Sequence, residues 1–243
     1  WKDEVYGALQ KNAADYSLVG DMREADCLNF LELNSDSIVL LIGGGFGYTT
    51  SSLSRMCKRV FVLEPDMRQY SFLTQRIEED GYKNVVLHHT LIQEEIDAFV
   101  VRKVFDAIIV EDSPFLRERG AFYETLIRSL KKGGAIYITV DKRVSFRFTR
   151  NLGRLGLQDI KCFMVLPNHR TPMFFLPLYN IGAMSYFFHY LFYLVATVPP
   201  EKRGKYKFAI GVASVVSKVL PVRFLVLLLQ IAFKSKAFIA QKL

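Results

Sequence analysis

The hydrophobic pattern divides most of the chain into short apolar runs that alternate with amphipathic segments. Apolar runs with little polar alternation occupy residues 38–42, 59–64, 84–89, 105–111, 135–140 and 157–165. Such runs are typical of strands buried on both faces of a parallel sheet. Segments of helical composition lie between them, at residues 48–57, 67–79, 92–101, 117–132 and 146–155. The alternation predicts a doubly wound α/β domain with right-handed crossovers.

The pattern changes at Pro167-Asn-His-Arg-Thr-Pro172, after which the chain is aromatic, apolar and basic until a last strand at residues 236–242. We predict that this seventh strand runs antiparallel beside the sixth. The connection between them then emerges at the carboxyl ends of the strands, where open α/β sheets bind ligands. The predicted parts are an N-terminal helical lid (1–36), an α/β domain (37–165 plus 236–243) and a helical insertion (166–235) against the reaction site.

A glycine-rich turn ends the first apolar run and leads directly into a helical segment. Gly43, Gly44, Gly45 and Gly47 lie in this turn. Glycines allow tight turns and let backbone N–H groups approach a ligand without a Cβ atom in the way. The N-terminal end of the following helix adds partial positive charge. The turn therefore predicts a binding site for a nucleotide or nucleoside.

The spacing of the glycines distinguishes between the known forms of such a turn. The dinucleotide pattern G-x-G-x-x-G needs a third glycine where Tyr48 stands, and a P-loop needs a lysine before the first one available, Lys58. The pattern G-x-G-x-G is present instead. Glu64 ends the second strand about 20 residues further on, where a carboxylate can accept hydrogen bonds from both ribose hydroxyls.

With these motifs the chain resembles class I S-adenosylmethionine-dependent methyltransferases, from about residue 38 to 165 and again at the last strand. The resemblance implies a Rossmann-like, seven-stranded, mostly parallel sheet and S-adenosylmethionine as the cofactor. The segments that carry it are Val39-Leu-Leu-Ile-Gly-Gly-Gly-Phe-Gly-Tyr48, Val62-Leu-Glu-Pro-Asp66, Phe105-Asp-Ala-Ile-Ile-Val-Glu-Asp112 and Leu130-Lys-Lys-Gly-Gly-Ala-Ile136. The cofactor-binding residues that it implies are Gly43, Gly45, Gly47, Glu64, Pro65, Thr90 and Glu111.

The chain departs from the usual family pattern at two positions. Leu41 stands where an acidic residue usually precedes the first glycine, and His89-Thr90-Leu91 replace an acidic residue expected near the adenine. The combination of Leu41 with consecutive glycines is similar to spermidine synthases, which use decarboxylated S-adenosylmethionine. An aminopropyltransferase is therefore the alternative with a related cofactor.

Charge is distributed unevenly between the two parts of the chain. Residues 1–141 contain 16 Lys+Arg and 22 Asp+Glu, a net charge of −6, whereas residues 142–243 contain 16 and 2, a net charge of +14. Such asymmetry predicts a polyanionic partner, either nucleic acid or an anionic membrane. The aromatic and aliphatic content of residues 181–198 and 208–233 favours helices lying in an anionic membrane interface over RNA binding. A helical cap and an oligomer interface remain alternatives.

Methyl transfer is an in-line displacement, so alignment contributes much of the acceleration and only weakly acidic acceptors need a base. Asp112, beside Glu111, and His169 are the candidate catalytic residues, and Arg170 is a candidate for gripping an acceptor phosphate or carboxylate. The three cysteines and four histidines show no metal-ligand spacing, so no metal is predicted. Unpaired cysteines suit a reducing compartment.

A looser similarity concerns the segment that follows the sixth strand. Pro167-Asn-His-Arg-Thr-Pro172, Leu176-Pro-Leu178 and Phe238-Ile-Ala-Gln-Lys242 are similar to methyltransferases of lipid-linked glycan and cell-surface polysaccharide pathways. This similarity implies O-methylation of a lipid-borne sugar or head group by a protein peripheral to the cytoplasmic side of a membrane. A non-catalytic membrane adaptor that retains the fold is the alternative from another class.

Overall fold

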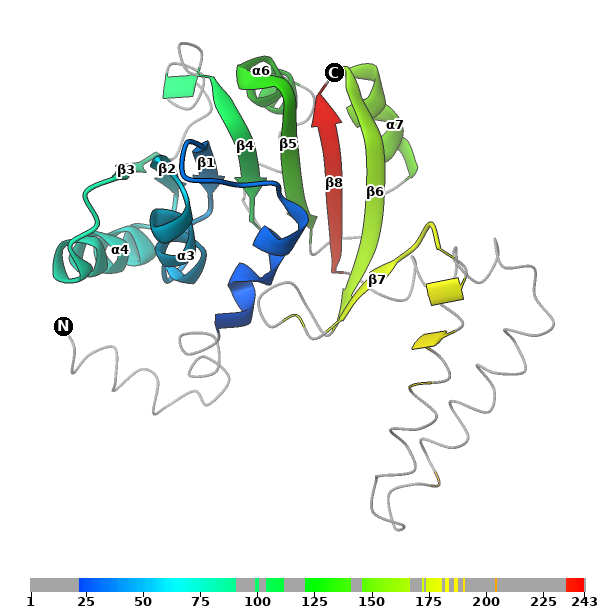
Figure 1. Ribbon diagram of the computed structural model, residues 1–243, viewed down its shortest axis with the longest axis horizontal. Coiled ribbons are helices and arrows are strands. Elements are labelled where there is room, and N and C mark those ends of the chain that lie inside the picture. Colours follow the sequence, from blue (N-terminus) through cyan, green and yellow to red (C-terminus); the bar gives the residue numbers. More distant parts are fainter. Residues whose placement is uncertain are drawn as a thin grey trace.

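A computed structural model describes residues 22–90, 99–100, 104–111, 121–140, 146–166, 172, 174–180, 182–183, 186–187, 190, 204 and 235–242. They form one mixed sheet with helices on both faces (Figure 1). The strand order is β3-β2-β1-β4-β5-β8-β6-β7. The strands are β1 (Ile38–Ile42), β2 (Arg59–Glu64), β3 (Val85–His89), β4 (Phe105–Val110), β5 (Leu130–Val140), β6 (Leu157–Leu166), β7 (Phe174–Pro177) and β8 (Lys236–Lys242).

The sheet has the predicted doubly wound architecture with a reversed last strand. Strands β1 to β5 pair in parallel. Strand β8 lies antiparallel to both β5 and β6, so β6 runs in the same direction as the first five strands. The carboxyl ends of β1, β2, β4, β5 and β6 therefore share one edge of the sheet.

The sheet has eight strands in place of the predicted seven, because β7 lies inside the segment predicted to be helical. It pairs antiparallel with β6, with Phe175 opposite Val165 and Leu176 opposite Met164. The period-two pattern of strands places Phe174 and Leu176 on one face and Phe175 on the other. All three are apolar, and four residues are too few for periodicity to separate a strand from a helix.

The helices are η1 (Met22–Phe30, a 3-10 helix), α3 (Tyr48–Met56), α4 (Met67–Asp80), α6 (Ala121–Ser129) and α7 (Phe146–Arg154). Helix α4 begins and ends where the sequence predicts. The Asp66 side chain accepts hydrogen bonds from two backbone N–H groups of the first turn, and Gly81 ends the helix in the left-handed conformation.

The predicted helix 117–132 is too long, because α6 ends at Ser129 and β5 begins at Leu130. The pair Gly133-Gly134, which directly follows the predicted helix and could have ended it, lies within the strand. A Cβ atom on Gly134 would approach the Asp106 carbonyl oxygen to 2.8 Å. The register between β4 and β5 also shifts here, between Phe105 and Ala107. The glycines thus accommodate a strand irregularity and close contact with β4.

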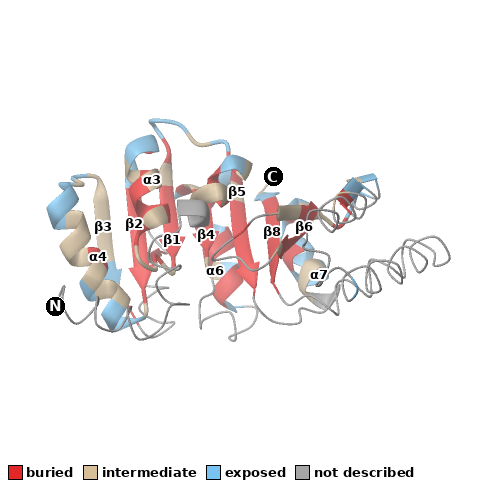
Figure 2. Cartoon of the chain, turned by 90° about the horizontal axis from the view of Figure 1, so that it is seen from below, coloured by how far each residue is buried: buried red, intermediate tan, exposed pale blue. Residues whose placement is uncertain are grey.

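The core has one layer on each face of the sheet, and adjacent residues of β1 point into opposite layers. Leu40 packs in the layer covered by α6 and α7, whereas Leu41 packs in the layer covered by η1, α3 and α4. Both side chains are fully buried. Figure 2 shows the buried central strands between the flanking helices. A smaller third cluster of Met164, Leu176, Leu178 and Phe187 joins β6 to β7 and the segment after it.

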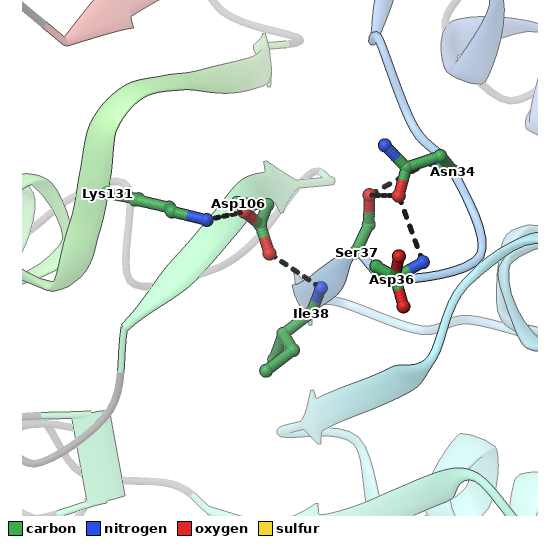
Figure 3. A network of polar contacts seen from close by, with 6 residues as sticks. All are labelled: Asn34, Asp36, Ser37, Ile38, Asp106 and Lys131. Atoms are coloured by element: carbon green, nitrogen blue, oxygen red, sulfur yellow. Dashed lines mark hydrogen bonds and ion pairs between the residues drawn. The ribbon is translucent and has the colours of Figure 1, made fainter.

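A polar network fixes the opposite, amino-terminal edge of the sheet (Figure 3). The Asp106 carboxylate accepts hydrogen bonds from the Ile38 backbone N–H and the Lys131 ammonium, each at 2.9 Å. Nearby, Asn34 and Ser37 hydrogen-bond to one another in the turn before β1. These contacts align the starts of β1, β4 and β5.

The predicted lid and insertion are described only in part. Residues 1–21 and most of 181–233 lie outside the described residues. Of the lid, Cys27 and Leu28 of η1 and the following Leu31 pack into the core layer that also contains residues of α3 and α4. Within the described part of the chain, no helix combines the length and apolar character needed to cross a lipid bilayer.

Candidate functional site

Three glycines give the turn between β1 and α3 its shape. Gly43, Gly45 and Gly47 have φ angles of +86°, +53° and +89°, a region that glycine adopts without strain. A Cβ atom on Gly43 would lie 2.2 Å from the Glu111 carbonyl oxygen, and one on Gly47 would lie 2.7 Å from a Leu73 methyl group. The turn therefore threads between β4 and α4 along a path that only glycine can follow.

Backbone hydrogen bonds hold this turn between its neighbouring strands. The Gly43 N–H donates to the Leu63 carbonyl at 2.9 Å, and the Glu111 N–H donates to the Ile42 carbonyl at 2.8 Å. Helix α3 starts immediately after Gly47, which provides no side-chain cap. The turn and the helix N-terminus thus form a rigid backbone cradle at the carboxyl edge.

The Glu64 carboxylate lies beneath the turn, as the sequence predicts. It is 1% exposed, and its two oxygens accept hydrogen bonds from the backbone N–H groups of Gly45 (2.9 Å) and Asp66 (2.8 Å). Burial raises the pKa of Glu64 to about 7, although these two N–H donors act in the opposite direction. Each oxygen keeps a further lone pair with which it can accept a hydroxyl proton.

A second carboxylate, that of Glu111, closes the end of β4. One of its oxygens accepts hydrogen bonds from the Thr49 hydroxyl at 3.1 Å and the Cys27 thiol at 3.7 Å. Burial, followed by the nearby negative charge of Glu111, raises the pKa of Cys27 well above its ordinary value, so Cys27 stays a neutral donor. Helix α3, η1 and β4 are thereby joined beside the glycine turn.

Arg76 braces the turn from α4. Its guanidinium donates a hydrogen bond to the Phe46 carbonyl at 2.7 Å and lies 4.7 Å from the centre of the Tyr48 ring. The Phe46 ring in turn packs edge-on against Phe72 of the same helix, with ring centres 5.4 Å apart. Sequence reasoning missed Arg76, Thr49 and Cys27, because no local motif marks residues that act on a turn from another element.

The end of β3 carries a partly buried histidine. His89 is the register partner of Glu64, its ring packs edge-on against Tyr70, and its Nε2 atom is buried without a hydrogen-bond partner. Thr90 follows directly and is 4% exposed. An unsatisfied polar nitrogen in the interior is costly, and here it lies next to the strand that carries Glu64, the carboxylate predicted to bind the ribose. The sequence does show His89 at the end of the third strand, but there it was interpreted only as the loss of an acidic residue expected near the adenine.

The structure brings Gly43, Gly45, Gly47, Glu64 and Glu111 together at one edge. Pro65 is half-buried directly after Glu64, and Thr90 lies at the end of the neighbouring strand. Their individual roles toward a cofactor stay predictions. The predicted catalytic residues Asp112 and His169 and the predicted acceptor-binding Arg170 lie outside the described residues.

Comparison with known proteins first defines the class of this fold and site. Phosphoethanolamine N-methyltransferase 2 of Haemonchus contortus, in complex with S-adenosyl-L-methionine, superposes with a TM-score of 0.54 and 13% identity, over 90% of this chain and 52% of that one. Precorrin 8w decarboxylase of Methanobacterium thermoautotrophicum superposes with a TM-score of 0.51 and 13% identity, over 90% and 89%. These likenesses show the Rossmann-like methyltransferase fold.

Sequence comparison then identifies the family. Residues 13–161 match the sequence model of the protein-L-isoaspartate(D-aspartate) O-methyltransferase family, and the chain belongs to this family. It is 32% identical over 121 residues to a protein-L-isoaspartate O-methyltransferase of Petrotoga mobilis (strain DSM 10674 / SJ95). That match covers 48% of this chain and 51% of the relative, so the chain spans about half the length of the curated relative it matches.

The predicted class, a class I S-adenosylmethionine-dependent methyltransferase, is confirmed, and S-adenosylmethionine is the cofactor of this class. The residues at the site fit this group. Gly43, Gly45 and Gly47 leave backbone space for it, Glu64 offers acceptors to its ribose hydroxyls, and His89 offers an unsatisfied buried nitrogen. When bound, the cofactor supplies an electrophilic methyl group on a sulfonium. The glycine turn and Glu64 would hold and orient it.

Proposed function

We propose that this protein is an S-adenosylmethionine-dependent O-methyltransferase that acts on a lipid-borne acceptor at an anionic membrane surface. Cofactor binding in this proposal rests on the glycine turn held by Glu64 and Glu111. The acceptor class rests on one observation, namely that the family match ends at residue 161. The chain beyond the match contains β7, β8 and most of the stretch from 142 to 243, whose net charge is +14.

The topology supports an acceptor site at the carboxyl edge. Strand β6 ends at Leu166 and β8 starts at Lys236 on the same edge as the glycine turn, so the connection between these two strands, which includes β7, starts and ends at that edge. Basic and apolar residues in that stretch suit a lipid carrying phosphate or another anionic head group. The proposed location is the cytoplasmic side of the membrane, with the protein peripheral to it.

An isoaspartyl carboxylate in damaged protein is the second candidate acceptor, and the family match and the Petrotoga mobilis relative favour it. A carboxylate is already a nucleophile and needs no general base. A sugar hydroxyl does need one, and Asp112 or Glu111 would supply it in the first candidate. The two candidates therefore differ in product chemistry as well as in acceptor.

Transfer of labelled methyl groups from S-adenosylmethionine separates these candidates. The protein is incubated in parallel with a total membrane lipid extract and with an isoaspartyl peptide, and each product is treated with mild alkali. We expect label in the lipid fraction that survives alkali, as a methyl ether does. Alkali-labile label on the peptide, with none in lipid, would instead establish the carboxyl methyltransferase. The Glu64→Gln variant is the control and should lose either activity.

Two further measurements address the remaining alternatives. Calorimetry should give tighter binding of S-adenosylmethionine than of its decarboxylated form, and the reverse order would indicate an aminopropyltransferase. Flotation with anionic vesicles should recover the protein in the lipid layer, whereas uncharged vesicles should not. Vesicle binding without transfer to any acceptor would indicate a non-catalytic membrane adaptor.

A further inference from the structure

Two carboxylates, those of Glu64 and Glu111, lie on either side of Gly43 at the carboxyl edge of the sheet. In the sheet register the last residue of β1 pairs with Leu63 of β2 and with Val110 of β4. Glu64 and Glu111 are the residues that follow. The Gly43 N–H bonds to β2, and the Glu111 N–H bonds to β1, so the register continues to this level. The glycine turn therefore starts between two carboxylates.

These two carboxylates point to the same face of the sheet. Leu63 and Val110, the residues before them, both lie in the core layer covered by α6 and α7. Because successive strand residues point to opposite faces, Glu64 and Glu111 face the other layer, in agreement with the contacts of Glu111 to η1 and α3. Strand β1 lies between β2 and β4, and neighbouring strands are about 4.8 Å apart, so the two backbones are about 10 Å apart.

Two donors fix one oxygen of the Glu111 carboxylate. The Thr49 hydroxyl and the Cys27 thiol both reach Oε1, at 3.1 and 3.7 Å, and the two residues are 1% and 2% exposed. Donors to a carboxylate favour its ionised form. Thr49 also belongs to the first turn of α3, where the helix dipole favours negative charge. The carboxylate is thus held in one orientation by groups that suit its charge.

The cofactor of this class carries hydrogen-bond donors at two separate places. Its ribose hydroxyls donate on one side of the sulfur atom, and its α-ammonium donates on the other. The chain that joins them is long enough to reach from one carboxylate to the other. Glu64 is the predicted ribose acceptor, and Glu111 lies across the glycine turn on the same face. A carboxylate offers about four lone-pair sites, so it can accept from structural donors and from a ligand ammonium together.

We propose that the Glu111 carboxylate binds the α-ammonium of S-adenosylmethionine, and that Thr49 and Cys27 are positioning residues that hold this carboxylate. The inference rests on the cofactor-binding part of the proposed function and does not depend on the acceptor. It leaves Asp112 as the candidate general base for a hydroxyl acceptor.

Calorimetry with S-adenosylhomocysteine tests this contact without turnover. This ligand keeps the α-ammonium, and its deamino analogue, in which hydrogen replaces the amino group, is the matched probe. We expect the unmodified protein to bind the analogue about tenfold more weakly or worse, as for loss of a charge-assisted hydrogen bond. Glu111→Gln should weaken binding of S-adenosylhomocysteine and reduce the difference between the two ligands to about twofold or less. An equal ratio of the two Kd values with and without Glu111→Gln would overturn the inference.

Variants of the two positioning residues separate loss of a donor from replacement of a side chain. Thr49→Val and Cys27→Ala remove the donors, whereas Thr49→Ser and Cys27→Ser retain them. We expect the ratio of the two Kd values to fall several-fold in the first pair and to be kept in the second. Glu124→Gln, which removes an exposed carboxylate from α6 on the other face, is the control and should keep the ratio. An unchanged ratio in Thr49→Val or Cys27→Ala would remove that residue from the proposal.

The ratio of Kd values also distinguishes positioning from a general loss of structure. Both ligands carry the same ribose and adenine, so a distorted site should weaken them by the same factor and leave the ratio unchanged. Titration of Glu64 affects both ligands alike and cancels from the ratio for the same reason. A variant that unfolds at a lower temperature therefore still gives a decisive result, provided that its folded form binds either ligand.

The inference and the proposed function fail in different ways. Methyl transfer to lipid, with a Kd ratio that Glu111→Gln does not change, would overturn the inference alone. A ratio that falls in Glu111→Gln, without transfer to any lipid, would overturn the acceptor assignment alone. Unchanged Kd values in Glu111→Gln together with a large loss of kcat would make Glu111 a general base and would overturn its role as the ammonium site.

Discussion

The backbone N–H of Gly45 donates a hydrogen bond to the buried carboxylate of Glu64, with an N···O distance of 2.9 Å. This contact joins the two motifs that indicated the cofactor, although 19 positions separate them in the chain. The glycine turn is therefore held by the residue that should bind the ribose. Changes at Glu64 should consequently affect both the shape of the turn and the hydrogen bonds made to the ligand.

Cofactor affinity should depend on pH through Glu64. Its pKa is raised from 4.5 to about 7 in the folded chain. The neutral carboxyl is thus favoured, and its contribution to stability is present below the ordinary pKa and lost as pH rises through about 7. Ribose hydroxyls donate to the ionised form, so binding should strengthen as pH rises toward about 7 and then level off.

Calorimetry in buffers of different ionisation enthalpy measures this effect directly. Near pH 6 we expect release of close to one proton per cofactor bound, with affinity falling up to about tenfold per pH unit below the pKa. Glu64→Gln should bind weakly and without this proton release. An affinity that stays constant from about pH 5.5 to about pH 8 would contradict the role of Glu64.

Alanine at Gly43 should abolish cofactor binding. Its Cβ atom would lie 2.2 Å from a backbone oxygen, and its φ angle of +86° adds strain of about 1–3 kcal/mol. Gly81→Ala is the matched control, because Gly81 is also left-handed, at +70°, but has open space around it. We expect Gly81→Ala to lower the free energy of unfolding by about 1 kcal/mol and to leave the cofactor Kd unchanged. Denaturant titration and calorimetry would measure both quantities, and normal binding by Gly43→Ala would refute this account of the turn.

Arg76→Lys should weaken cofactor binding several-fold while keeping the charge of α4. Lysine cannot reproduce the planar guanidinium that bonds to the Phe46 carbonyl and stacks on Tyr48, so the turn should become less rigid. Arg68→Lys, on the exposed first turn of the same helix, is the control and should bind normally. Isothermal titration of the two variants provides the comparison. Similar cofactor affinities in the two variants would show that the contacts of Arg76 with Phe46 and Tyr48 do not contribute to cofactor binding.

Lys242→Met should destabilise the fold without affecting the site. The Lys242 ammonium donates to the carbonyls of Ile127, Arg128 and Leu130 at 2.7, 3.2 and 2.6 Å, at the end of α6. Losing these charge-assisted bonds should lower the free energy of unfolding by about 2–3 kcal/mol.

Lys131→Met is the control for that loss, because its ion pair with Asp106 is exposed to solvent, which weakens the attraction between the two charges. Denaturant titration gives both values, and the cofactor Kd should match that of the unmodified protein in both variants. A smaller decrease in the free energy of unfolding for Lys242→Met than for Lys131→Met would contradict the structural role assigned to Lys242.

Much of the fold could be predicted from local pattern alone. Continuous apolar runs such as residues 38–42 mark strands that are buried on both faces, and burial is a property that each residue carries with it. The left-handed glycines, the cap at Asp66 and the stop at Gly81 depend only on their own backbone angles. These local rules identified the α/β architecture, the cofactor class, and the glycine turn and Glu64 as candidates for binding the cofactor.

Contacts between segments that lie far apart in the chain could not be predicted, because no local sequence pattern depends on them. Whether residues 174–177 form a strand depends on an open edge of β6, and where α6 ends depends on β5 pairing with β4. The thiol of Cys27 reaches Glu111 across 84 positions, and Lys242 reaches α6 across more than 110. The place of β8 between β5 and β6 is likewise a property of the assembled sheet, because strand order follows from pairing between segments that lie far apart in the chain.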